Sequence, residues 1–364
     1  MDEKSEKVMR SCNYFLNYHY EPRSTKEILL ELASYSSDKD YADSYGIGEY
    51  TQEFEASVAK ILGKESAVFM PSGTMAQQIA LRIWCEKKNN FKVAFHPTAH
   101  LEIAEYFGYS FLHNIKRVPF SAPELLSHRL LTLDDIQGIQ EQIAVLLLEL
   151  PQRPIGCQLP SWEELNNITN WAKEHQVKLH LDGARLWECK SFYNRSYEQI
   201  SNSFDSVYVS FYKDLGGLTG ALLAGDSEFI SEAKIWQRRH GGNLKTQFPY
   251  IVSAKLGLEN HLNKMDLYVK KAKEIANVFN QFDQIEILPN PPHTNMFHMY
   301  LRGECEKLSQ AHLELAEKYK IWLFNGIETS LLSSYCQTEI MIGDNALKLD
   351  LDIVAQFIGE MFKK

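Results

Sequence analysis

The sequence has no long hydrophobic run, few cysteines and no excess of positive charge, and each absence excludes a class of protein. No stretch approaches the length of a membrane-spanning helix, and residues 1–10 are charged with no apolar segment behind them. We therefore expect neither a membrane span nor a secretory signal. The net charge of −9 disfavours a nucleic-acid partner, because neutralising phosphates needs a basic surface. A cytoplasmic protein without a membrane partner is expected.

The six cysteines of this 364-residue chain are scattered and form no CxxC pair. Such spacing indicates neither a disulfide framework nor a zinc site, so we expect reduced thiols and no bound metal. The length is sufficient for a large core and predicts two domains.

Short apolar segments alternate with helical ones between about residues 66 and 225. The expected strands are residues 67–70, 92–95, 144–149, 178–181, 207–209 and 221–224, with helices at 75–84 and 162–175 among them. This alternation predicts an α/β fold with a mostly parallel sheet and helices on both faces.

The last hundred residues differ in pattern. Helical segments near 265–282 and 309–319 flank an apolar run at 296–301, which predicts a smaller α/β domain. We place the large domain at residues 20–257 and the small domain at 258–364 together with 1–19.

Two of the expected strands end in residues that suit one kind of chemistry. Asp182 follows the strand 178–181, and Lys213 comes shortly after the strand 207–209. A carboxylate can keep a pyridine nitrogen protonated, and a lysine amine can form a Schiff base with an aldehyde. The pair predicts a pyridoxal 5'-phosphate site. The alternative is that Asp182 caps a helix and Lys213 is a solvated surface charge.

A Ser72-Gly73-Thr74 turn lies between an expected strand and an expected helix. Backbone amides at a helix start favour an anion, and glycine lets a phosphate come close. A simple helix cap is the alternative interpretation.

In this order the motifs resemble those of the threonine aldolases, within the aromatic amino acid β-eliminating lyase group. The matching segments are Tyr45-Gly46, Pro71-Ser72-Gly73-Thr74-Met75, His100 with Glu105, His180-Leu181-Asp182-Gly183-Ala184-Arg185-Leu186, Lys213, Gly241-Gly242 and Thr294-Asn295-Met296. The resemblance implies a pyridoxal 5'-phosphate enzyme of the aspartate aminotransferase fold (fold type I). It also implies an amino acid substrate, cleavage of threonine or allo-threonine to glycine and acetaldehyde, and a homodimer or homotetramer.

The resemblance further implies three catalytic residues. Lys213 would hold the cofactor and then transfer protons, Asp182 would pair with the pyridine nitrogen, and His100 would stack on the ring. A core or capping role is the alternative for His100.

Phosphate binding would fall to Ser72, Gly73 and Thr74. The family carries basic residues on both sides of its Gly-Gly pair, and here Arg238 and Lys245 occupy those places. The alternative for Arg238 is a solvated helix face.

The substrate half of the predicted site departs from the family pattern. Arg185 would bind the substrate carboxylate through its guanidinium fork. Where the family has a histidine near the substrate hydroxyl, this chain has Gln152, which cannot act as a base at neutral pH. A second carboxylate-binding arginine is replaced by Met341, and the family's amino-terminal Arg-Ser-Asp-Thr has no clear counterpart around residues 15–18.

Two interpretations of these departures stay open. Arg153 could replace the missing arginine from another direction, with a surface arginine as the alternative, or the substrate is not a small β-hydroxy-α-amino acid. Another lyase reaction at Cβ, such as β-elimination, and a cofactor-binding protein that has lost catalysis are the alternative functions. A nucleotide-binding α/β protein is disfavoured, because the sequence has neither a G-x-G-x-x-G turn nor a P-loop.

Overall fold

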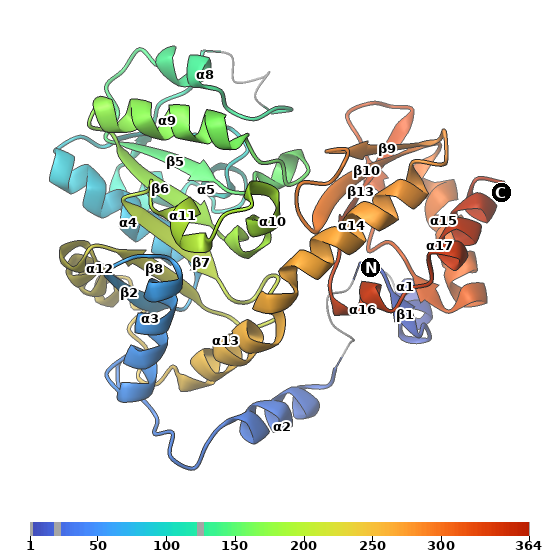
Figure 1. Cartoon of the computed structure of the whole chain (residues 1–364), viewed down its shortest axis with the longest axis horizontal. Helices are drawn as coiled ribbons and strands as arrows, with labels where there is room; N and C mark the ends of the chain where they lie inside the picture. Colours follow the sequence, from blue (N-terminus) through green and yellow to red (C-terminus); the bar gives the residue numbers. More distant parts are fainter. Residues whose placement is uncertain (1–2, 18–22, 122–126, 364) are drawn as a thin grey trace. The chain divides into compact units, whose positions relative to one another are not determined.

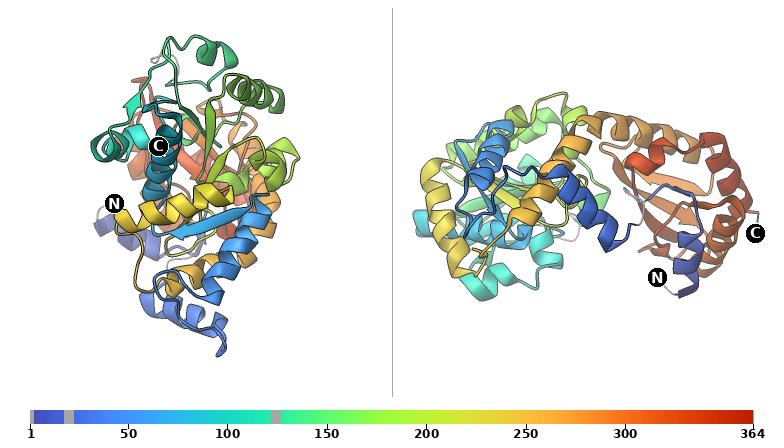
Figure 2. Two further views of the ribbon diagram at one scale, coloured as in Figure 1. Left: turned by 90° about the vertical axis from the view of Figure 1, so that its left-hand side faces the viewer. Right: turned by 90° about the horizontal axis from the view of Figure 1, so that it is seen from below.

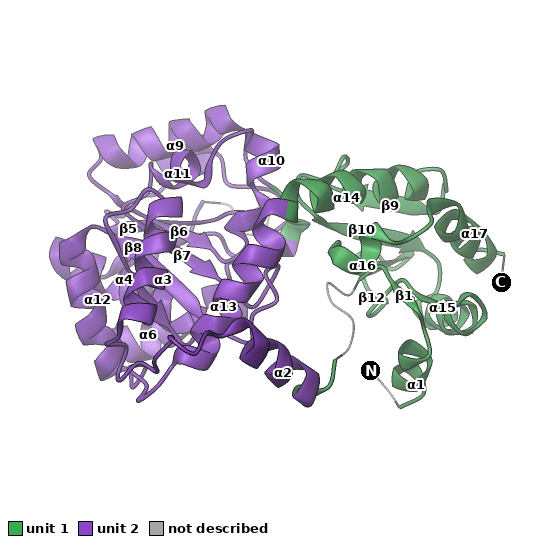
Figure 3. Ribbon diagram, turned by 60° about the horizontal axis from the view of Figure 1, so that its bottom comes forward, with its two compact units in different colours: residues 1–25, 155–158, 264–364 green, residues 26–154, 159–263 purple. Residues whose placement is uncertain are grey.

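The computed structural model describes residues 3–17, 23–121 and 127–363, and the chain divides into two compact units (Figure 3). Unit 1 comprises residues 1–25, 155–158 and 264–364, and unit 2 comprises residues 26–154 and 159–263. The expected boundary at residues 19–20, and the end of the segment 15–18, lie outside the described residues. Every predicted catalytic, cofactor-binding and substrate-binding residue belongs to unit 2.

Unit 2 contains a sheet of seven strands in the order β2-β8-β7-β6-β5-β3-β4 (Figure 1). The strands are β2 (Ser66–Met70), β3 (Lys92–Phe95), β4 (Lys116–Arg117), β5 (Val145–Glu149), β6 (Lys178–Gly183), β7 (Ser206–Ser210) and β8 (Ala221–Gly225). Only β8 runs antiparallel to its neighbours, and the other adjacent pairs are parallel. The predicted mostly parallel sheet is confirmed, and all six expected strands are present.

Helices cover both faces of this sheet (Figures 1 and 2). Between residues 25 and 261 the α-helices are α2 (Thr25–Tyr35), α3 (Glu49–Ile61), α4 (Gly73–Lys88), α5 (His100–Ile103), α6 (Gly108–His113), α8 (Leu133–Gln137), α9 (Trp162–Glu174), α10 (Lys190–Tyr193), α11 (Tyr197–Ser201), α12 (Ser227–Arg239) and α13 (Phe248–His261). Side chains of β2 alternate between the faces: Val68 joins the cluster formed with α4 and α12, whereas Phe69 packs against Phe54 of α3.

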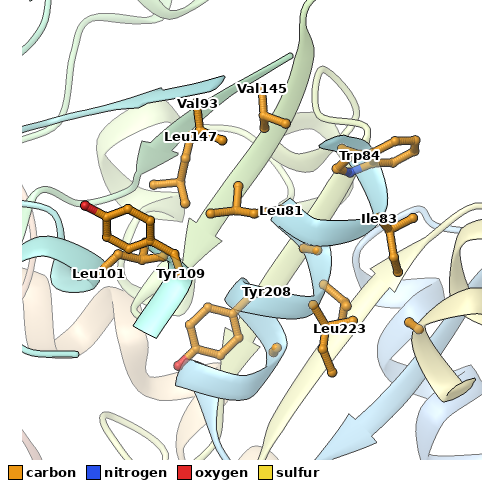
Figure 4. Packing of buried hydrophobic residues seen from close by; sticks show 14 of the residues in the cluster. Leu81, Ile83, Trp84, Val93, Leu101, Tyr109, Val145, Leu147, Tyr208 and Leu223 are labelled. Atoms are coloured by element: carbon orange, nitrogen blue, oxygen red, sulfur yellow. The ribbon is translucent and has the colours of Figure 1, made fainter. Parts of the chain in front are cut away.

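Helix α4 fixes the core on one side of the sheet. Ser72 caps its start by accepting a hydrogen bond from the Met75 amide at 3.3 Å. Further along, the Trp84 indole donates to the Ser206 hydroxyl of β7 at 2.8 Å and stacks on Phe229 of α12. Figure 4 shows this cluster, with Tyr208 of β7 at its margin beside α4. Trp84 thereby ties the later turns of α4 to β7 of the sheet and to α12.

A buried carboxyl group on α3 gives unit 2 a testable pH dependence. Glu55 is 6% exposed, its Oε1 accepts a hydrogen bond from the Phe69 amide at 2.8 Å, and burial raises its pKa from 4.5 to about 7. Below pH 4.5 the group is protonated in both the folded and the unfolded state. As pH rises towards 7, the unfolded chain releases the proton while the folded protein keeps it, so the free energy of unfolding falls.

We expect Glu55→Gln to flatten this part of the pH dependence, which amounts to at most about 1.4 kcal/mol per pH unit. Urea unfolding at several pH values between 4.5 and 7 measures it, with Glu53→Gln on the exposed side of α3 as the matched control. Parallel curves for wild type and Glu55→Gln would refute the assignment.

Unit 1 is built around a four-stranded antiparallel sheet in the order β12-β13-β10-β9, with a separate parallel pair β1-β11. Its strands are β1 (Tyr14–Phe15), β9 (Ile285–Leu288), β10 (Met296–Arg302), β11 (Ile321–Trp322), β12 (Glu328–Thr329) and β13 (Tyr335–Met341). Its α-helices are α1 (Glu3–Arg10), α14 (Met265–Phe279), α15 (Cys305–Tyr319), α16 (Asp344–Leu347) and α17 (Leu351–Met361).

The expectation of six reduced thiols is wrong for one pair. Cys305, at the start of α15, and Cys336, in β13, form a disulfide, and their Cα atoms are 5.5 Å apart. The pairing of β10 with β13 places Leu301 opposite Cys336, so the chain leaving β10 brings Cys305 alongside. Spacing along the sequence does not reveal this proximity. The four cysteines outside this disulfide are buried: Cys12, Cys85, Cys157 and Cys189.

Candidate active site

A row of three polar side chains crosses the sheet where β5, β6 and β7 approach their carboxyl ends. Glu149 is the register partner of Asp182, which in turn is the partner of Tyr208. Register partners on adjacent strands project to the same face, here the face covered by α4. Asp182 and Tyr208 are only 1% and 2% exposed. The row therefore lies at the edge where α/β sheets bind ligands.

Helix α4 contacts two members of this row from positions one turn apart. Gln77 Nε2 donates to Asp182 Oδ2 at 2.7 Å, and the Ala184 amide donates to Asp182 Oδ1 at 3.1 Å. Four residues before Gln77, a Cβ on Gly73 would overlap the Tyr208 hydroxyl. Only glycine lets this hydroxyl approach the helix start so closely. Thr74 follows in the same turn and is partly exposed.

Helix α4 also positions His100 through an intermediate carboxylate. Gln78 Nε2 donates to Glu105 Oε2 at 3.3 Å, and Glu105 Oε1 lies 2.8 Å from His100 Nδ1. This hydrogen bond raises the pKa of His100, against the opposing effect of burial. Glu105 therefore both orients the imidazole ring and favours its protonated form.

Lys213 follows β7 and is partly buried beside the row. Burial lowers the pKa of its amine, as does the nearby positive charge of Arg185, while Asp182, Glu149 and Asp214 act in the opposite direction. A lowered pKa increases the neutral, nucleophilic fraction of a lysine at physiological pH. Burial likewise raises the pKa of Asp182, with the charge of Lys213 opposing it.

Glu149, at the end of β5, is a strongly perturbed acid of the row. Burial, followed by repulsion from Asp182, raises its pKa to about 8, so it is largely protonated at neutral pH. Gln152 Nε2 donates to Glu149 Oε2 at 3.2 Å and to Thr98 Oγ1 at 3.1 Å. The Arg153 amide donates to Glu149 Oε1 at 3.3 Å, while the Arg153 side chain is exposed. Gln152 therefore holds Glu149 in place.

Arg185 lies between two carboxylates rather than facing open solvent. Its Nη1 is 3.5 Å from Asp214 Oδ1 and 3.8 Å from Glu188 Oε1, and all three residues are buried. The two acids compensate the buried guanidinium charge and restrict its position.

The two basic residues that flank the Gly-Gly pair are both exposed. Arg238 lies in the last turn of α12, and Lys245 Nζ donates to Ser44 Oγ at 2.9 Å. Gly242 of this pair lies against the first turn of α4, because a Cβ on it would overlap the Met75 sulfur. The loop that carries Gly242 thus lies beside the predicted phosphate turn. The Lys245 side chain is bonded to Ser44 instead.

Most of the predicted site residues meet in one place. Asp182, Lys213 and His100 influence each other electrostatically, Arg185 acts on Lys213, and Gln77 of α4 contacts Asp182. In the described part of the chain, no cluster of His, Cys, Asp and Glu could hold a metal ion.

Comparison with known proteins identifies the family. The family model for beta-eliminating lyases matches residues 25–304. The chain belongs to the beta-eliminating lyase family. The predicted enzyme class, a lyase of the threonine aldolase group, is confirmed by this match and by the relatives.

The relatives of this lyase include named threonine aldolases. Low-specificity L-threonine aldolase 1 of Arabidopsis thaliana is 28% identical over 296 residues, covering 78% of this chain and 81% of the relative. The low specificity L-threonine aldolase of Saccharomyces cerevisiae is 26% identical over 71% of this chain and 67% of its own.

Solved structures share the complete fold. A Listeria monocytogenes protein, provisionally described as an L-allo-threonine aldolase, is 40% identical, with a TM-score of 0.93 over 99% of this chain and 98% of that one. Leishmania major threonine aldolase, at 18% identity, has a TM-score of 0.71 over 96% of this chain and 99% of that one, which supports the fold alone. The predicted fold class is confirmed.

The lyase site contains residues that sequence reasoning did not select. Gln77 contacts Asp182. The only indication of this in the sequence is that Gln77 follows Gly73 by four positions and so lies on the same helix face. Glu149 carried a signal, since it is an acid that ends a strongly apolar strand. Tyr208 looks like an ordinary core residue in the sequence, and only the strand register reveals its place beside Asp182.

Proposed function

We propose that this lyase cleaves a β-hydroxy-α-amino acid, L-threonine or L-allo-threonine, to glycine and acetaldehyde, using pyridoxal 5'-phosphate. The observation that carries the proposal is the convergence of Asp182, Lys213, His100 and the start of α4 at one sheet edge. The names of the relatives in Arabidopsis, yeast and Listeria support the choice of substrate.

The residues present fit this cofactor. The buried carboxyl group of Asp182 contacts Gln77 of α4, and Gly73 starts the same helix. Gly73 and Gln77 are four residues apart, a rise of about 6 Å along the helix. The carboxyl group suits a protonated ring nitrogen, and the amides of the helix start suit a phosphate. Lys213 supplies the amine that can react with an aldehyde.

When bound, pyridoxal 5'-phosphate supplies an electron sink for the pair released as the Cα–Cβ bond breaks. Asp182 would hold a proton on the ring nitrogen, and His100, oriented by Glu105, would cover one face of the ring. Lys213, with its lowered pKa, would accept and return protons near Cα. Ser72, Gly73 and Thr74 would hold the phosphate, with Arg238 and Lys245 as further candidates.

Aldol cleavage begins when a base accepts the proton of the β-hydroxyl. Gln152 cannot be that base, and its amide is engaged with Glu149 and Thr98. This observation keeps β-elimination as the second candidate function, because that reaction does not begin by deprotonating the hydroxyl.

Product analysis separates the two functions. Purified protein loaded with cofactor is incubated with L-threonine and with L-allo-threonine, and glycine, acetaldehyde, keto acid and ammonia are quantified. Equal amounts of glycine and acetaldehyde support the proposal. A keto acid with ammonia would replace it by β-elimination, and no turnover of either amino acid would indicate a different substrate.

Substrate binding gives a prediction about two arginines. We expect Arg185→Lys to raise KM about tenfold or more, because an ammonium cannot form the two parallel hydrogen bonds that a guanidinium makes to a carboxylate. Arg153→Ala tests whether this exposed arginine supplies the second contact predicted above. Steady-state kinetics with L-threonine decide. If KM stays unchanged in Arg185→Lys, Arg185 is not the carboxylate ligand; if it stays unchanged in Arg153→Ala, that role for Arg153 is excluded.

Homo-oligomerisation and a cytoplasmic location remain predictions. Four large apolar side chains near the end of α5 and in α6 are exposed in unit 2: Tyr106, Phe107, Phe111 and Leu112. They support self-association, because exposed apolar clusters mark interaction surfaces. Light scattering of the purified protein measures the oligomeric state. In the described residues, no helix is both long enough and apolar enough to cross a membrane.

A further inference from the structure

Three buried charged residues lie together in the segments that follow β6 and β7. Arg185 comes just after β6, and Glu188 follows it by three residues. Asp214 comes from the other segment, where it directly follows Lys213. Arg185 Nη1 lies 3.5 Å from Asp214 Oδ1 and 3.8 Å from Glu188 Oε1. The proposed function makes Arg185 a ligand of the substrate carboxylate but gives the two acids no part in binding.

This cluster holds more negative than positive charge. The side chains of both acids are 0% exposed and that of Arg185 is 10% exposed, so water and salt screen the three charges only weakly. One guanidinium balances one carboxylate, and the second carboxylate, when ionised, leaves one negative charge in excess. A ligand that reaches Arg185 therefore meets a group whose positive charge is more than balanced by its neighbours.

A carboxylate that binds Arg185 cannot avoid the two acids. The guanidinium group is compact and planar, and its nitrogen atoms lie close together. A ligand that forms hydrogen bonds to it therefore lies within several ångströms of Asp214 and Glu188, which already approach Nη1. Like charges repel each other strongly at such distances in a buried site. The two acids thus weaken the attraction of Arg185 for any carboxylate.

A positively charged amine experiences the opposite effect. Asp214 acts to raise the pKa of Lys213, because a negative charge favours a protonated amine, and Arg185 acts to lower it. The cluster therefore lies within electrostatic reach of the position where the substrate amine would bind. A ligand that carries a carboxylate and an amine together gains from this arrangement, whereas a carboxylate alone does not.

The two acids also restrict the arginine from different directions. Glu188 belongs to the same segment as Arg185, whereas Asp214 belongs to the segment that carries Lys213. Because β6 and β7 are adjacent parallel strands, both segments leave the same edge of the sheet. Asp214 thereby ties the guanidinium to the segment that carries the reactive amine.

We propose that Asp214 and Glu188 hold Arg185 in place and lower its affinity for carboxylates, so that the site selects amino acids over simple carboxylate ions and releases glycine readily. This inference rests on the proposed function, because it concerns the ligand that Arg185 would bind and the product that would leave. Both acids act through Arg185 and do not contact the substrate themselves.

The test compares two ligands that differ only in the carboxylate, glycine and methylamine. Cofactor-loaded full-length protein is titrated with each, and Kd is measured from the absorption of the bound cofactor. Asp214→Asn and Glu188→Gln each remove one charge and preserve the shape of the side chain. We expect each to tighten glycine binding about tenfold relative to methylamine, because the carboxylate then meets one negative charge fewer. The ratio of the two Kd values is decisive, because Asp214 also acts on Lys213.

Acetate provides a second measurement, because it has the carboxylate without the amine. It should compete with glycine more effectively in both variants than in the wild type. Equal competition by acetate in the wild type and the variants would contradict the proposed selection.

Asp205→Asn is the matched control. Asp205 precedes β7 and pairs with Lys178 at 2.6 Å, so this variant removes an acid from an ion pair at the other end of the same strand. The control should keep the wild-type ratio of Kd values. Thermal melts identify a variant that fails to fold. If one of the two acid variants does, the other carries the test, because the same change is expected for both.

The outcomes separate this inference from the proposed function. If the wild type prefers glycine to methylamine and the folded variants keep that ratio or bind glycine more weakly, the inference is wrong while the proposed function stands. A wild type without preference for glycine would also overturn the inference, because Arg185 would then not bind the carboxylate. A cofactor-loaded wild type that responds to neither ligand would overturn the inference and the proposed function together.

Discussion

Lys213→Ala should lower turnover of L-threonine by at least about 10⁴-fold, because a covalent catalytic group cannot be replaced by a neighbouring residue. The variant should also lose the visible absorption band of bound cofactor. Burial and the charge of Arg185 lower the pKa of this amine, which favours its neutral, nucleophilic form. Steady-state kinetics and absorption spectra measure the two effects.

Lys116→Ala is the matched control for this experiment. Lys116 is exposed and pairs with Glu141 at the surface of unit 2, where such an ion pair contributes little to stability. The control should keep both turnover and absorption band. A Lys213→Ala protein with turnover within tenfold of wild type would show that another residue holds the cofactor.

Asp182→Asn is expected to have the second largest effect, a loss in kcat of roughly 10²- to 10⁴-fold. The substitution preserves the shape of the side chain and can still accept from the Ala184 amide, but an amide cannot hold a proton on a ring nitrogen. Folding should be little affected, because the substitution removes an acid whose pKa is raised by burial. Circular dichroism melts measure the effect on folding, and kcat measured with saturating cofactor measures the effect on catalysis.

Gln77→Leu is the variant to compare with Asp182→Asn. It removes the hydrogen bond from Gln77 Nε2 to Asp182 while keeping the carboxylate. We expect an effect in the same direction but smaller, because Asp182 keeps its charge and its bond from Ala184. Wild-type kcat in Asp182→Asn would exclude a proton-holding role for Asp182.

The sequence was sufficient to predict the sheet and to select Asp182 and Lys213 at its edge. The strands β5, β7 and β8 of unit 2 are short, largely apolar runs, and burial on both faces leaves that pattern in the residues themselves. Asp182 and Lys213 could be selected because both occur where such runs end. Their meeting follows from the parallel arrangement of β6 and β7.

The remaining contacts depend on which elements become neighbours. Tyr208 acquires its place only because β7 pairs with β6 in a register that sets it beside Asp182. Gln77 reaches Asp182 only because α4 packs on that face of the sheet. Cys305 reaches Cys336 only because β10 pairs with β13. Such long-range geometry leaves no local pattern of hydrophobicity, charge or turn residues.

The most direct test of the central claim is to reduce the cofactor-loaded wild type with borohydride and map the modified peptide by mass spectrometry. The account predicts one phosphopyridoxyl group per chain, attached to Lys213 and lost when excess L-threonine is added before reduction. Attachment to a different lysine, or no attachment after reconstitution with excess cofactor, would contradict it.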